Sequence, residues 1–138
     1  MTIHNPETFK ENKPAGFDGT FDWDFLIEAF RRPKEKAGVK PLIQPMDLDC
    51  IVERKGKFLV FETKQPGKNV PQGQAITLNA LVATGLFTVI ILHAKYKEDV
   101  DGWQVWYKNK KEDREGDWNQ LYKFVRRWFV WASGWPKE

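Results

Sequence analysis

The stretch of residues 47–64 constrains the fold more than any other part of the chain. It holds two runs rich in β-branched and aromatic side chains, one on each side of Gly56. Such runs separated by a glycine turn predict two antiparallel strands joined as a β-hairpin. Because side chains two residues apart in a strand lie on the same face, Glu62 and Lys64 are predicted to project side by side from the end of the second strand.

The hairpin also predicts that two carboxylates meet across its strands. Asp49 lies seven residues before Gly56 and Glu62 lies six residues after it, and residues equidistant from a turn face each other. Asp47 has the same strand parity as Asp49. Mg²⁺ prefers carboxylate ligands, and Lys64 beside them would stabilise an attacking hydroxide or the charge of a phosphorane-like transition state. The pattern therefore predicts a metal site suited to hydrolysing a phosphodiester.

The alternative interpretation of Glu62 and Lys64 is a surface ion pair on an edge strand. Such a pair is common and contributes ~0–1 kcal/mol to stability. The surrounding sequence favours the metal site, because an apolar strand precedes the pair and an acid opens the partner strand. A Pro-Gly loop and a helix with an early glutamine follow it.

The remaining segments predict an α/β order around this hairpin. Residues 1–18 are polar and are predicted to be a loose lead-in. Apolar periodicity indicates helices, and runs of β-branched and aromatic residues indicate strands. The predicted helices are 20–32, 72–84 and 118–132. The predicted strands are 47–54, 57–64, 86–93 and 102–107, with a short edge strand around 42–43, while the charged segments 94–101 and 108–115 are predicted to be a turn and a loop.

This order predicts a mixed central sheet flanked by helices on both faces. The strand that follows helix 72–84 is expected to run parallel to the second hairpin strand, through a right-handed crossover. The length of 138 residues fits a single domain with one core.

The cysteine content and the apolar segments indicate the cellular location of the protein. Cys50 is the only cysteine, so no intrachain disulfide is expected, and a reducing, cytoplasmic location is predicted. The N-terminus has no basic segment followed by an apolar one, so no signal peptide is expected. The longest apolar run is far shorter than the ~20 residues that a membrane span needs, so no membrane association is expected.

The distribution of charge and aromatic residues points to partners. Residues 1–30 carry six acids against two lysines, so the rest of the chain carries a net charge of +7. That part is predicted to present either a basic surface to a polyanion or an ordinary solvated surface. Trp128, Trp131 and Trp135 exceed what one helix face can bury, which predicts a dimer interface or packing on the sheet.

These motifs together resemble the PD-(D/E)XK nuclease superfamily. Pro45-Met-Asp-Leu-Asp49 stands in place of the Pro-Asp element, and Glu62-Thr-Lys64 in place of the (D/E)XK element. The spacing from Asp49 to Glu62 resembles that of archaeal-type Holliday junction resolvases. The following Pro-Gly turn and the helix with Gln74 in its first turn are similar to the VRR-NUC branch. The Pro is not adjacent to Asp49, so Asp47 competes for the ligand role, and the Gly-Gly-Val-Arg-like entry of that branch is absent.

The resemblance covers residues 20–93 and implies a restriction-endonuclease-like αβββαβ core, to which residues 102–132 add a strand and a helix. It implies that Mg²⁺, replaceable by Mn²⁺, is bound by carboxylates and a backbone carbonyl, that a lysine activates water, and that a glutamine positions the lysine or a phosphate. The implied metal ligands are Asp49, Glu62, the backbone carbonyl of Thr63 and an acid of the first helix, Glu28 with Asp24 as the alternative. The implied water-activating and positioning residues are Lys64 and Gln74, and Asp47 takes an outer position.

The implied activity is that of a Mg²⁺-dependent DNA endonuclease selective for branched or junction DNA and acting as a homodimer. The alternatives are a restriction-type or repair endonuclease or exonuclease on linear DNA, and a protein with a nuclease fold that only binds nucleic acid. The basic clusters 108–111 and 126–127 are candidate phosphate contacts. His4 and His93 are interpreted as structural or exposed, and Cys50 as a core thiol.

Overall fold

The computed structural model describes residues 25, 29–30 and 46–138. The chain divides into two units, residues 1–47 and 48–138, and the elements described below belong to the second. Among the described residues, no helix has the length and apolar character needed to cross a lipid bilayer.

Some predicted features lie outside the described residues. These are most of the helix at 20–32, including its candidate acids Glu28 and Asp24, the short strand around 42–43, and the segment 1–18 with His4. Phe25 and Ala29 of the predicted helix are described and are helical.

The predicted hairpin is formed by β1 (Cys50–Arg54) and β2 (Lys57–Thr63), which pair antiparallel. The two turn residues, Lys55 and Gly56, both have positive φ, 50° and 79°. Two consecutive positive φ values give a turn whose twist matches that of the flanking strands. Cys50 pairs with Phe61, so the next pair outward is Asp49 with Glu62.

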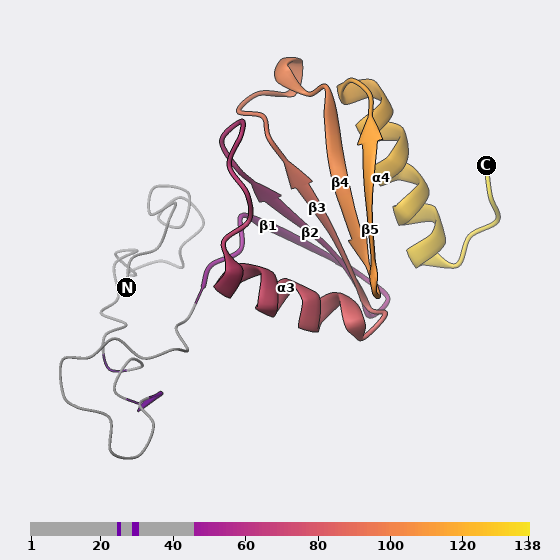
Figure 1. Cartoon of the computed structure of the whole chain (residues 1–138). Helices are drawn as coiled ribbons and strands as arrows, with labels where there is room; N and C mark the ends of the chain where they lie inside the picture. The colour runs from indigo at the N-terminus through magenta and orange to yellow at the C-terminus, as the bar shows by residue number, and fades with distance from the viewer. Residues whose placement is uncertain (1–24, 26–28, 31–45) are drawn as a thin grey trace, which may run out of the picture. The chain divides into compact units, whose positions relative to one another are not determined.

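Three more strands complete a mixed five-stranded sheet in the order β1-β2-β3-β4-β5 (Figure 1). Helix α3 (Gln72–Ala83) connects β2 to β3 (Phe87–Leu92), and these two strands are parallel, as predicted. A 3₁₀ turn, η1 (Lys97–Asp99), precedes β4 (Gly102–Tyr107), which is antiparallel to β3. Helix α4 (Trp118–Ser133) ends the fold.

Helices α3 and α4 lie on opposite faces of the sheet. Side chains alternate between the two faces along each strand, so the parity of the residues that contact each helix identifies its face. Leu59 and Phe61 belong to the core cluster that includes Trp128 of α4. Glu62, of the other parity, is hydrogen-bonded to Gln74 of α3. Residues 48–138 therefore form three layers, helix–sheet–helix, and the α/β class predicted from the sequence is confirmed.

The segment 108–115, predicted to be a loop, instead contains β5 (Lys110–Glu115), antiparallel to β4. All six residues of β5 are charged and exposed, so they show no apolar alternation for a sequence pattern to detect. The strand is held by its backbone ladder and by cross-strand side chains. Lys111 lies over the ring of its partner Trp106, with Nζ 3.8 Å from the centroid. A charged edge strand of this kind resists pairing with another sheet.

Gly102 opens β4 where the backbone of β5 lies against it. A Cβ at this position would lie 2.7 Å from the carbonyl oxygen of Arg114. We expect Gly102→Ala to lower the free energy of unfolding by about 2 kcal/mol, because the two strand ends must separate. The matched control is Gly73→Ala in α3, where a Cβ meets nothing within 4 Å. This substitution is expected to raise the free energy of unfolding by up to about 1 kcal/mol. Urea denaturation of both variants measures the contrast, and equal stabilities would contradict it.

Candidate functional site

Glu62 is the buried acid at the centre of the candidate site. Its side chain is 2% exposed, although it lies only one residue from the end of β2. Its Oε1 accepts a hydrogen bond from the backbone N–H of Asp49 at 3.2 Å, and its Oε2 accepts one from Nε2 of Gln74 at 2.6 Å. The hairpin and helix α3 therefore both fix the orientation of this carboxylate.

Asp49 lies beside Glu62 at the mouth of the hairpin. Its Oδ2 accepts hydrogen bonds from the backbone N–H and the hydroxyl of Thr63, each at 2.8 Å. These bonds hold Asp49 in the position that the pairing of β1 with β2 gives it. The structure thus brings the two predicted carboxylates together across the hairpin.

Lys64 follows on the same face of the sheet as Glu62. Its backbone N–H donates to the carbonyl of Leu92 at 2.8 Å, which extends the parallel ladder of β2 and β3 beyond Thr63. Its Nζ lies 3.8 Å from Oε2 of Glu62, and its side chain is 19% exposed. The ammonium group therefore stands between the buried carboxylate and the solvent.

The environment of Glu62 disfavours its charge. Burial raises the pKa of this carboxyl, and the negative charge of Asp49 raises it further. The hydrogen bonds from the Asp49 backbone and from Gln74, together with the charge of Lys64, oppose the rise in pKa without cancelling it. An additional cation beside Asp49 and Glu62 would supply the missing compensation.

Gln74 has a buried oxygen that points to a ligand or water at this site. It lies in the first turn of α3, where it was predicted, and its Oε1 is buried with no hydrogen-bond partner among the described residues. Buried acceptors are nearly always satisfied in folded proteins. A water or ligand donor next to Glu62 would satisfy this oxygen.

The donor set suits Mg²⁺. Within the described part of the chain, no group of three or more His, Cys, Asp or Glu side chains is arranged to hold a metal. Mg²⁺ is usually held by one or two carboxylates with waters and substrate phosphate, so Asp49 and Glu62 are sufficient for it. Participation of the Thr63 carbonyl remains a prediction, and the first-helix acid lies outside the described residues.

His93 is a neighbour of this site that the sequence did not predict. Thr63 pairs with Leu92 in the parallel ladder, so the next residues, Lys64 and His93, lie side by side. The Nε2 atom of His93 is 2.8 Å from the carbonyl oxygen of Lys68, in the loop after β2. The signal that identifies His93 is the parallel register, which the sequence pattern alone does not give.

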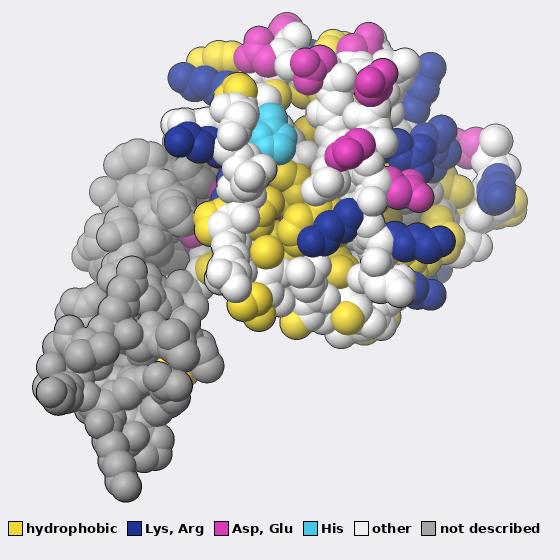
Figure 2. Space-filling view, in the orientation of Figure 1, with side chains coloured by type: hydrophobic (Ala, Val, Ile, Leu, Met, Phe, Trp, Pro, Cys, Tyr) yellow, Lys and Arg dark blue, Asp and Glu magenta, His cyan; other side chains and the backbone are white. Residues whose placement is uncertain are grey.

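A cleft of about 590 Å³ extends from this edge across the part of the sheet that α3 leaves uncovered. Ile91 and His93 lie at one side, and Gln104, Lys111 and Arg114 line the other. Figure 2 shows hydrophobic side chains at the bottom of a hollow on this face, with charged side chains around it. Asp101 and Asp113 also line the cleft, so its charged groups are of both signs, and the carboxylate pair is not part of its lining.

The prediction that Cys50 is a core thiol is wrong. Cys50 is exposed. The reason is its place in β1, the edge strand among the described strands of the sheet, where Ile51 and Val52 are exposed as well.

Comparison with known proteins adds no assignment. No family model, curated protein or solved structure matches the chain. The functional proposal is therefore supported by the geometry of the residues and by the motif resemblance.

Proposed function

We propose that this protein is a metal-dependent DNA endonuclease of the PD-(D/E)XK type that cleaves branched DNA such as Holliday junctions. The observation that carries the proposal is the buried Glu62 carboxylate held beside Asp49, with the ammonium of Lys64 3.8 Å away. A hairpin, a crossover helix and a parallel strand (β1, β2, α3, β3) support the restriction-endonuclease-like core.

Asp49 and Glu62 would hold Mg²⁺, or Mn²⁺ in its place, with the carbonyl of Thr63 as a further ligand. A metal ion bound there would polarise the phosphate and lower the pKa of a bound water. The raised pKa of Glu62 and the unpartnered Oε1 of Gln74 support this assignment, because both are relieved when a hydrated cation is present.

The side chains have distinct roles around that position. Lys64 orients the water and stabilises negative charge that develops on the phosphate oxygens. Gln74 fixes the plane of the Glu62 carboxylate through its 2.6 Å hydrogen bond. Because these groups are positioned by backbone ladders and a helix, the site is organised before substrate binds.

Features outside the site support a DNA substrate. Residues 48–138 hold 15 Lys and Arg against 11 Asp and Glu, a net charge of +4. The fold has no separate sequence-reading module among its described elements, which favours recognition of DNA shape and backbone. A homodimer would cut two strands symmetrically, and exposed Tyr122 and Trp135 offer apolar surface to a second copy. A cytoplasmic location is part of the same proposal.

The direct test is cleavage by the purified protein of four-way, flap, splayed and linear DNA, with Mg²⁺ and with EDTA. We expect four-way junctions to be cut at least about tenfold faster than linear duplex, and no cleavage in EDTA. Cutting of linear duplex at one sequence would favour a restriction-type enzyme instead. No cleavage of any DNA, with no heat of Mg²⁺ binding in calorimetry, would favour a protein that only binds nucleic acid.

A further inference from the structure

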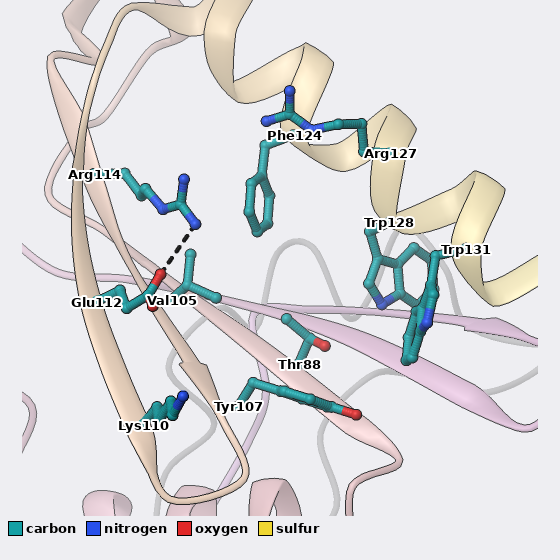
Figure 3. Close-up of a pocket in the computed structure, with 10 residues that line it drawn as sticks. All are labelled: Thr88, Val105, Tyr107, Lys110, Glu112, Arg114, Phe124, Arg127, Trp128 and Trp131. Atoms are coloured by element: carbon teal, nitrogen blue, oxygen red, sulfur yellow. Dashed lines mark hydrogen bonds and ion pairs between the residues drawn. The ribbon is translucent and has the colours of Figure 1, made fainter. Parts of the chain in front are cut away.

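A second pocket lies on the opposite face of the sheet from Glu62, between α4 and strands β3, β4 and β5 (Figure 3). Its volume is about 330 Å³, within the range of small-molecule sites. Its walls are largely aromatic. The rings come from both layers: Tyr107 from the sheet and Phe124, Trp128 and Trp131 from α4.

The aromatic walls are held in place by a contact between two of the rings and by a hydrogen bond to the backbone. The rings of Tyr107 and Trp131 pack edge to face with centroids 6.1 Å apart. The hydroxyl of Tyr107 donates to the carbonyl of Gly85 at 3.3 Å. Trp131 is 47% exposed and stands at the mouth of the pocket, so an incoming flat ring can stack on it.

The interior offers hydrogen-bonding groups that the protein leaves unused. Trp128 is 7% exposed, and its buried indole N–H has no acceptor among the described residues. In Figure 3 the indole nitrogen lies on the edge of the ring that faces Thr88. Thr88, also buried, lines the pocket there. A buried N–H without an acceptor is costly, so an acceptor on a bound ligand would be favoured at this point.

The rim of the pocket is positively charged. Three basic residues line it against one acid, Glu112, which is paired with Arg114 at 3.0 Å. Within the described part of the chain, Lys110 and Arg127 have no ion pair or side-chain hydrogen bond. The pocket therefore combines flat apolar walls, an internal donor and two uncompensated cations.

We propose that this pocket binds a single unstacked nucleotide. The base lies between the aromatic walls, with an acceptor on its edge toward Trp128 and Thr88, and the phosphate lies at the basic rim, where Lys110 and Arg127 stand at opposite ends and either can bind it. The inference is independent of the proposed nuclease activity, because the pocket and the carboxylate pair are on opposite faces of the sheet. The same chemistry is presented by a free mononucleotide and by the phosphorylated end of a single strand.

Calorimetry on the full chain in EDTA tests the proposal without requiring cleavage. The probes are dTMP, thymidine, inorganic phosphate, a duplex with a 5′-phosphorylated single-stranded overhang, and the same duplex with blunt ends. We expect dTMP or the overhang to bind at least about tenfold more tightly than thymidine, phosphate or the blunt duplex. Tight dTMP binding identifies a free-nucleotide site, and tight binding of the overhang alone identifies a strand-end site.

Substitutions of the lining residues test whether the nucleotide binds in this pocket. The double variant Lys110→Ala/Arg127→Ala is expected to weaken binding of the tighter probe about tenfold or more, and Trp131→Ala about tenfold. The matched controls are Lys123→Ala and Tyr96→Ala, exposed positions outside the pocket, which should bind like the parent. Absence of binding by every probe, equal binding of thymidine and dTMP, or parent-like binding by the pocket variants overturns the proposal. A Trp131→Ala protein that changes only self-association would assign this surface to a second copy of the chain instead.

Discussion

Replacing Lys64 by methionine is expected to slow cleavage of a four-way junction by about 10²–10³-fold while leaving junction binding in EDTA unchanged. Lys64 is the cation that lies 3.8 Å from Glu62, at the point where we place the scissile phosphate. Removing one preorganised charge from a developing anion costs about this much in rate. Methionine keeps the length of the apolar stem, so the packing at the end of β2 is retained.

Single-turnover rates with saturating protein separate this catalytic effect from binding. The matched control is Lys95→Met, an exposed lysine beyond the end of β3, which is expected to cleave within about twofold of the parent. Equal losses in both variants would mean that net charge, and not the position of Lys64, sets the rate. Full activity in Lys64→Met, or in Glu62→Ala, would remove the proposed site.

The hairpin and its pair of acids were predictable because the information is local. Gly56 fixes the turn, the strand period fixes the faces, and equal distance from the turn brings Asp49 opposite Glu62. Gln74 was predictable for a similar reason, since it lies in the first turn of the helix that follows the Pro-Gly loop. These features need only short sequence separations.

The features that the sequence did not predict depend on long-range pairing or lack an apolar pattern. β5 has six charged residues in succession and forms a strand only because β4 offers it a backbone ladder. The parallel pairing of β2 with β3 was predicted, but its register, which places His93 beside Lys64, has no local signal in the sequence. The aromatic pocket requires α4 to pack on β3–β5, and the surplus tryptophans of the C-terminal segment left two alternatives open, a dimer interface or packing on the sheet.

Glu62→Gln is expected to abolish Mg²⁺-dependent cleavage and at the same time to stabilise the metal-free fold at neutral pH. Burial raises the pKa of Glu62, so the folded protein favours the protonated carboxyl more than the unfolded chain does. As pH rises through the raised pKa, the folded state must release a proton that the unfolded state has already lost, and stability falls. Glutamine removes this cost and retains a hydrogen-bonding partner for Gln74.

The pH dependence of the added stability of Glu62→Gln tests whether the raised pKa of Glu62 causes it. In EDTA at pH 7–8 we expect the free energy of unfolding of Glu62→Gln to exceed that of the parent by roughly 1 kcal/mol. Below the pKa of an exposed glutamate, about 4.3, both states of the parent are protonated and the gain should disappear. Urea denaturation at pH 4 and pH 7.5 measures both values. The exposed Glu115→Gln of β5 is the control and should show no such gain.

Adding Mg²⁺ should reverse the order of stability. A metal that binds only the folded parent stabilises it by about 2.7 kcal/mol at a free concentration one hundred times its Kd. Glu62→Gln lacks one of the two carboxylates and should gain little, so the parent becomes the more stable protein. If Glu62→Gln remains more stable than the parent by the same amount at pH 7.5 in Mg²⁺, Glu62 is a buried acid without a metal partner. If Mg²⁺ removes the stability advantage of Glu62→Gln over the parent, the raised pKa of Glu62 is linked to the ion that the site binds.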